Sequence, residues 1–204
     1  MNTHLFTDKA IIEGLQAQAR SLGASATGLL QTEQVVIQAR FAQMCAGPPS
    51  CPSYGLAPGC PPHAPSSEDF QQLLQSFNTA LVFKIDAPVK DLMGERRLSL
   101  ARTIHRIAAT LERSALSRGI NKAKAMAAGS CKELFCDDIE TCVVLANSAP
   151  CRFPDLARPS LSAVGVDFAA LAHQFGWSFG KLTKTNIANQ NSEMGLMAGF
   201  VLLG

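Results

Sequence analysis

The 204-residue sequence predicts an α+β fold, in which helices pack on a β-sheet and carry cysteine-rich loops. Apolar residues recur at helical spacing in several segments, and short apolar runs of strand length lie between them. This strand–helix alternation suggests a sheet covered by helices, with a ferredoxin-like topology as one candidate. We expect a single domain over residues 1–204, because hydrophobic residues make up 47% of the chain and suffice for one core.

The N-terminal region predicts a helix, a strand and a second helix. Residues 8–22 are amphipathic, and Gly23 is expected to end the helix that they form. Residues 24–30 follow as a strand of small residues. Thr32 is then expected to cap a helix that continues to Phe41.

Residues 45–65 are expected to form an irregular loop, since they hold seven of the eleven prolines and show no periodicity. A loop of that length is unusual in a compact domain unless something organises it, and a metal centre would do so. Ser66 or Ser67 is expected to cap the next helix, which ends near Phe77. Residues 79–85 have the clearest strand pattern in the chain.

A long basic helix is predicted over residues 95–118, and a short strand over residues 122–128. We interpret the arginines of the helix as a solvated face, with a docking surface for an acidic partner as the alternative. His105 is interpreted as a surface residue. The arginines expected to face solvent are Arg102, Arg106 and Arg113, and the residues expected to be buried are Ile104, Ile107 and Leu111.

The C-terminal part predicts a helical turn capped by Ser160 and a helix over residues 167–176. Two strands, residues 177–185 and 195–203, are expected to form a hairpin across a polar link.

Seven cysteines fall into two compact groups. The earlier group is Cys45, Cys51 and Cys60, and the later group is Cys131, Cys136, Cys142 and Cys151. Thiolates are soft ligands for iron and zinc, so both groups predict metal or iron–sulfur ligation. Disulfides are the second interpretation, because residues 1–15 show no secretory signal and seven thiols leave one unpaired. Inert thiols rank third, since these cysteines lie among charged residues and prolines.

The later group has four thiols, the usual full complement for a four-iron four-sulfur (4Fe–4S) cluster or a structural zinc ion. Zinc sites usually contain two tight cysteine pairs, whereas the intervals here lengthen from four to five to eight residues. This spacing favours a cluster. Lys132, Arg152 and Arg158 are candidates for screening its negative charge. Asp137 and Asp138 are candidate acids or bases, with solvated loop carboxylates as the default reading.

The earlier group supplies three thiolates, which leave one coordination position of a cluster for another ligand. His63 is the local candidate, because imidazole replaces thiolate at some iron–sulfur sites. An exposed loop histidine is the alternative for this residue. The Tyr54 hydroxyl, midway in the loop, is a candidate to reach a sulfur or a substrate.

The stretch CPSYGLAPGCPP, which begins at Cys51, resembles the hallmark of a domain-of-unknown-function family described as predicted metal-binding proteins. So do the AGSC run ending at Cys131, the CRFP run beginning at Cys151, and the RPSLSAVGVD run ending at Asp167. The resemblance extends from about Ile11 to the C-terminal strand. It implies a metal or cluster and assigns no reaction. A shorter stretch, residues 22–29, resembles the opening of corrinoid-dependent reductases such as epoxyqueuosine reductase, which implies a corrinoid-linked role.

These observations favour an iron–sulfur redox protein that transfers electrons to or within a larger system, with one 4Fe–4S cluster expected and two as an alternative. The other hypotheses are an enzyme that uses an open three-cysteine site and a zinc-stapled interaction protein. A redox partner protein is expected, and a homodimer is compatible with the sequence. A net charge of +2 and 6% aromatic residues argue against nucleic acid binding. The longest apolar run, residues 195–204, is too short to span a bilayer, and we expect a cytoplasmic protein.

Overall fold

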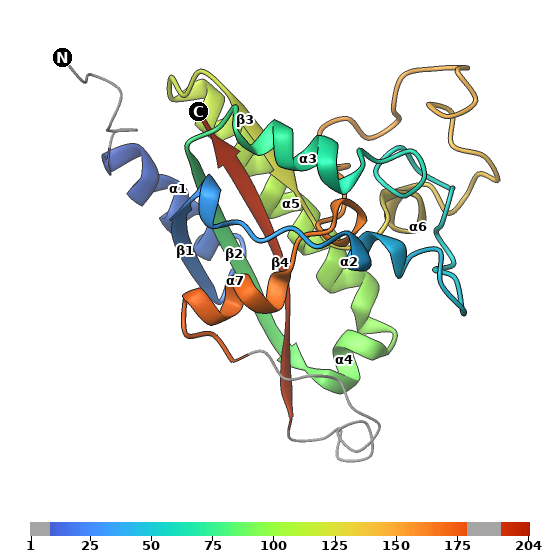
Figure 1. Ribbon diagram of the computed structural model, residues 1–204, viewed down its shortest axis with the longest axis horizontal. Coiled ribbons are helices and arrows are strands. Elements are labelled where there is room, and N and C mark those ends of the chain that lie inside the picture. Colours follow the sequence, from blue (N-terminus) through green and yellow to red (C-terminus); the bar gives the residue numbers. More distant parts are fainter. Residues whose placement is uncertain (1–8, 179–192) are drawn as a thin grey trace.

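The computed structural model describes residues 9–178 and 193–204 and confirms the α+β class. Within these residues, antiparallel strands form one sheet in the order β1-β2-β4-β3 (Figure 1). The strands are β1 (Ala26–Gln31), β2 (Thr79–Pro88), β3 (Ala123–Met126) and β4 (Met194–Leu203). Leu81 of β2 lies opposite Leu29 of β1 and Val201 of β4, so the two long strands form the centre of the sheet.

The ferredoxin-like topology is not confirmed. β2 and β3 both run antiparallel to β4, which lies between them, so β2, the following long helix and β3 form a split βαβ unit. The described elements, however, begin with a helix before β1, and β1 pairs directly with β2. This order of elements differs from the β-α-β-β-α-β sequence of the ferredoxin-like fold.

Helices cover both faces of the sheet. Successive side chains of a strand point to opposite faces, so the apolar strands present side chains for burial on each face. On one face, α1 (Lys9–Ser21) and α5 (Arg96–Ser117) pack against Leu81 and Phe83. On the other face, α3 (Ser67–Leu74) and α7 (Phe168–Gln174) pack in a core with Val82. Phe70 of α3 stacks on Phe200 of β4, with 6.4 Å between the ring centroids. Burial of each such large side chain contributes on the order of 2 kcal/mol.

Several predicted elements are confirmed. The helix predicted over residues 8–22 is α1, and that predicted over residues 95–118 is α5, whose C-terminal end is followed by Gly119 at a φ of 92°. Ser66 caps α3 and accepts a hydrogen bond from the Asp69 amide, and Asp167 caps α7 in the same way through the Ala170 amide. The buried and exposed faces of α5 are also as expected, with Ile104, Ile107 and Leu111 buried and Arg102, Arg106 and Arg113 exposed.

The predicted helix from Thr32 to Phe41 is wrong. A short 3-10 turn, η1 (Thr32–Gln34), is separated by extended chain from α2 (Ala39–Gln43). Thr32 is buried, and its hydroxyl donates a 2.7 Å hydrogen bond to the Phe77 carbonyl. Its side chain therefore joins η1 to the turn that follows α3 instead of capping a helix.

Two C-terminal expectations also change. Ser160 does not cap the short turn η2 (Ser162–Val164), whose preceding residue is Leu161. Of the predicted hairpin, the second strand is β4, which pairs with β2 and β3. Residues 177 and 178 are not in a strand, and the rest of the predicted first strand lies outside the described residues.

Two short helices were not expected: α4 (Val89–Met93) and α6 (Cys131–Phe135). No helix in the described ranges is both long and apolar enough to cross a bilayer.

Candidate metal centre

The two cysteine-rich segments lie together at one end of the molecule, beyond α2 and α6 (Figure 1). The earlier segment connects α2 to α3, and the later one begins at α6 and returns to the sheet at Ser160. They meet at Gly59, where a Cβ atom would lie only 2.8 Å from Pro159 Cα. The absence of a side chain at residue 59 therefore permits this close contact of two backbones.

The four thiols of the later group line one cavity of about 250 Å³. Its wall also contains apolar side chains, among them Phe135, Val143 and Phe153. One water needs only about 10–15 Å³ on this measure, so the space is far larger than a single ion or water requires. All seven cysteines are free thiols, and none forms a disulfide in the structure.

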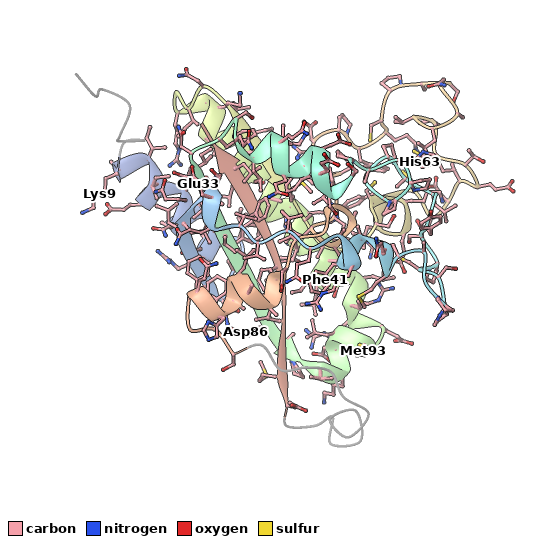
Figure 2. The ribbon with its side chains drawn as sticks, in the orientation of Figure 1. Lys9, Glu33, Phe41, His63, Asp86 and Met93 are labelled. Carbon is pink, nitrogen blue, oxygen red and sulfur yellow. The ribbon has the colours of Figure 1, made fainter. Side chains whose placement is uncertain are left out.

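The three thiols of the earlier group line a second, smaller cavity of about 110 Å³. Cys60 is buried and Cys51 is exposed, so this cavity reaches the surface. Tyr54 lines the same cavity, as its position in the loop suggested. His63 is exposed and is not among the residues that line either thiol cavity, which corresponds to the exposed-loop interpretation (Figure 2).

Burial raises the pKa of several of the thiols. Burial first, and then the neighbouring thiols, Cys60 foremost, raise the pKa of Cys131 to about 12. Burial also raises the pKa of Cys60, although the hydrogen bond with Ser130 opposes this. The pKa of Cys45 is raised by burial and then by Cys51 and Cys60. These thiols therefore need a positively charged group to become thiolates at neutral pH.

The donor chemistry fits a thiolate-ligated group, while the spacing does not fit a single ion. Within the part of the chain that is described, no three His, Cys, Asp or Glu side chains are arranged to hold one metal ion. Zinc lies about 2.3 Å from each sulfur, which would require sulfur atoms less than about 4 Å apart. The four later thiols nevertheless line one common cavity.

The three basic residues expected near the later group do line its cavity, and each has its own partner. Lys132 is buried and donates a 2.7 Å hydrogen bond to the Cys136 carbonyl. Arg152 binds Asp138 through two hydrogen bonds of 2.8 and 2.9 Å, which lower the pKa of that carboxyl. Asp138 is therefore an ionised partner of Arg152 at neutral pH. Arg158 forms an ion pair with Glu112.

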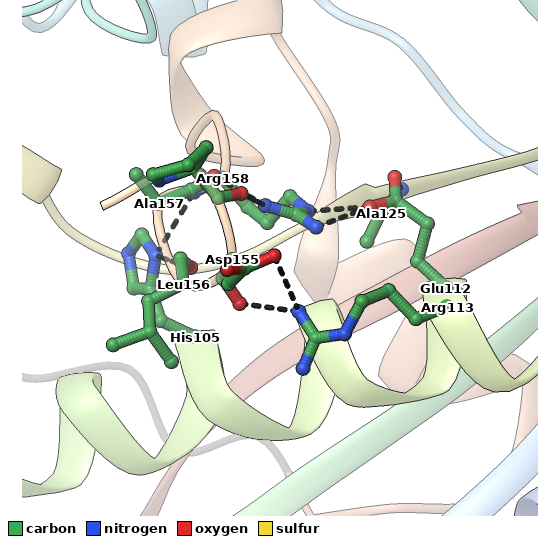
Figure 3. Close-up of polar contacts among 9 residues, drawn as sticks. His105, Glu112, Arg113, Ala125, Asp155, Leu156, Ala157 and Arg158 are labelled. Atoms are coloured by element: carbon green, nitrogen blue, oxygen red, sulfur yellow. Dashed lines mark hydrogen bonds and ion pairs between the residues drawn. The ribbon is translucent and has the colours of Figure 1, made fainter. Parts of the chain in front are cut away.

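Helix α5 holds the later cysteine segment in place. Arg102 Nε donates to the Leu134 carbonyl at 2.8 Å, and Arg97 pairs with Glu133 of α6. Further along the helix, Glu112 binds Arg158 at 2.6 Å, and Arg113 binds the Asp155 carbonyl (Figure 3). The exposed arginine face thus also supports the later cysteine segment.

The surface interpretation of His105 is wrong. Its ring is buried, packs edge-to-face on Phe135 at 5.4 Å, and presents Nδ1 to the Arg158 amide at 3.2 Å (Figure 3). Burial lowers the pKa of His105 to about 4, and the nearby backbone carbonyl of Leu156 only partly opposes this. Helical spacing places His105 on the buried face, since position 105 lies four residues after buried Ala101 and three before buried Ala108.

Sequence reasoning also missed Ser130, Glu133 and Arg97 as residues of the earlier cavity. They lie more than thirty positions from the cysteines of that group, so no local spacing points to them.

A model of the family described as "Predicted metal-binding protein (DUF2284)" matches residues 28–203 of the chain. No curated protein and no solved structure gave a significant match. Since the match covers most of the sequence, the chain belongs to this family.

Proposed function

We propose that this member of a predicted metal-binding family holds a 4Fe–4S cluster on the later group and passes electrons to a partner protein. The observation that carries the proposal is the cavity of about 250 Å³ lined by all four of these thiols. Four cysteine thiolates are the usual ligand set of such a cluster.

Two features favour a cluster over zinc. Among the described residues, no three thiols converge on a single point, as the ligands of a structural zinc ion must. The cavity that they surround has room for several atoms. When bound, a 4Fe–4S cluster supplies one-electron oxidation and reduction.

The residues of this chain would control the environment of the cluster. Phe135, Val143 and Phe153 keep part of the cavity wall apolar, and solvent exclusion is one factor that sets a reduction potential. The Lys132 side chain brings positive charge to the same wall, whereas the charge of Arg152 is balanced by Asp138. Arg97, Arg102 and Glu112 of α5 fix the segment that carries the thiols.

Anaerobic purification followed by iron, sulfide and zinc analysis tests the proposal. The protein should be brown, with broad absorption near about 400 nm and roughly four irons and four sulfides per later centre. Stoichiometric zinc in a colourless protein would instead support the zinc-stapled hypothesis.

Single replacement by Ser at Cys131, Cys136, Cys142 or Cys151 should remove the iron of the later centre and lower thermal stability, because ligand binding and folding are coupled. C51S is the matched control, since Cys51 lines the other cavity. It should leave the spectrum of the later centre unchanged. Full iron and sulfide in all four later-group variants would refute this ligand assignment.

The earlier cavity supports a second candidate function, an enzyme with an open coordination position. Cys45, Cys51 and Cys60 supply three thiols, Cys51 is exposed, and Tyr54 and Ser130 provide hydroxyls at the same cavity. A small substrate would reach a cluster there directly from solvent. The expected sign is a second centre whose spectrum changes when small ligands such as cyanide are added. A single cluster per chain, with these three thiols free to alkylate, would exclude this function.

A further inference from the structure

Ser130 connects the two cysteine groups. Its hydroxyl oxygen lies 3.3 Å from Cys60 Sγ, and the next residue, Cys131, lines the other cavity. Ser130 and Cys60 are only 5% and 7% exposed, so water competes little for this contact. Ser130 precedes α6, yet its side chain makes no capping hydrogen bond in the described structure. The contact with Cys60 is therefore the role that the structure gives its hydroxyl.

The direction of this hydrogen bond depends on the state of the sulfur. A free Cys60 thiol donates to Ser130. A ligating thiolate has no proton, so the Ser130 hydroxyl must then donate to the sulfur. Hydrogen bonds to the sulfurs are among the factors that set the potential of an iron–sulfur centre.

We propose that Ser130 is a positioning residue that donates a hydrogen bond to the Cys60 sulfur of a centre on the earlier group and raises the reduction potential of that centre. The inference rests on the second candidate function above, because it requires a centre held by Cys45, Cys51 and Cys60. Reduction adds one electron to the centre and breaks no bond. The reduced form is the more negative one, so a donor aimed at its sulfur stabilises it more than the oxidised form.

The test is an anaerobic redox titration with dithionite as the electron donor, followed by electron paramagnetic resonance. S130A removes the hydroxyl and should lower the midpoint potential of the earlier centre. At the wild-type midpoint, the ratio of reduced to oxidised centre should fall at least about threefold, or roughly 28 mV for one electron. S130T keeps a hydroxyl and should retain most of the wild-type potential. S130G is the second hydroxyl-free variant if S130A loads poorly, since glycine is tolerated before a helix.

S53A is the matched control, because Ser53 is 7% exposed and lines the same cavity. It should leave the potential unchanged. An unaltered potential in S130A or S130G at full iron content, or an equal shift in S53A, would overturn the inference while the second candidate function stands. Wild-type protein with no centre on the earlier group would overturn both together, and the iron and sulfide count separates these two failures.

Discussion

At the scale of single residues, His105 shows how burial fixes a protonation state. Its pKa of about 4 keeps the ring neutral at physiological pH, so Nδ1 remains available to accept the Arg158 amide. The contact joins α5 to the chain just before Pro159, where the two cysteine-rich segments meet. A charged imidazole would lose this acceptor.

This burial predicts a pH dependence of stability. The pKa of His105 is lowered on folding from about 6.5, so the unfolded chain binds one more proton between pH 6.5 and 4. His105 should therefore leave the free energy of unfolding unchanged above pH 6.5 and lower it increasingly below that pH. The decrease should reach about 3 kcal/mol near pH 4. Urea unfolding of wild type and H105Q between pH 7 and 4.5 measures this decrease. The free energy of unfolding should fall less steeply with falling pH in H105Q than in wild type. H63Q, at an exposed site, is the control and should keep the wild-type slope.

The sequence identified residues whose chemistry is visible in their type. Thiols that occur three and four at a time indicate a metal site wherever they lie, and both groups do surround cavities. Ser130 and Glu133 have no such signature. They join the earlier cavity only because α6 folds against a loop that is far away in the chain, and that contact is tertiary.

At the scale of elements, α5 is both a wall of the core and the support of the later cysteine segment. Its apolar stripe packs on the sheet, and beside that stripe Glu112 receives the Arg158 guanidinium. Both side chains of this pair are nearly buried, with 16% and 12% exposed. Glu112 also accepts the Ala125 amide of β3 at 2.7 Å.

Replacement of Glu112 by Gln should leave the Arg158 charge unpaired while retaining an acceptor for the Ala125 amide. We expect the free energy of unfolding to fall by about 3 kcal/mol, because a nearly buried charge loses its partner. E13Q is the matched control, since the Lys9–Glu13 pair has exposed side chains and should contribute less than about 0.5 kcal/mol. Chemical denaturation of both variants measures the difference. Equal losses in the two would contradict a structural role for Glu112.

Elements with strong periodicity were predictable, and those fixed by tertiary contacts were not. α1, α5 and β2 carry their pattern in consecutive residues. The segment after Thr32 begins with Glu33 and Gln34, but the β-branched run from Val35 to Ile37 favours extended chain. The buried hydrogen bond from Thr32 to Phe77 and the bridge between Ile37 and Val166 hold it there. The strand order also had to come from the structure, since β1, β3 and β4 lie far apart in sequence.

At the scale of the whole molecule, the site depends on two segments whose backbones touch at Gly59 and Pro159. Gly59 precedes Cys60 of the earlier cavity, and it also lines the later cavity. Its φ is not positive, so the need for glycine there is purely one of space.

G59A should separate the two segments, because the new Cβ would lie 2.8 Å from Pro159 Cα and backbone cannot rotate away. We expect the iron content of the anaerobically purified protein to fall at least twofold, with a smaller loss of far-ultraviolet circular dichroism. G47A is the matched control in the same loop, since its nearest neighbour would lie at an ordinary 3.6 Å. Normal iron content in G59A would show that the close contact is dispensable.

The central position of β4 has a consequence for how the protein is made. On the ribosome, both cysteine groups are synthesised before Met194–Leu203, yet β3 has only β4 beside it in the described sheet. Until β4 emerges, the thiols belong to a nascent chain in which β2 and β3 lack the strand that joins them. Under the proposed function, insertion of iron and sulfide would therefore be productive only after translation of β4, and the interval before it would be when these thiols are most vulnerable to oxidation.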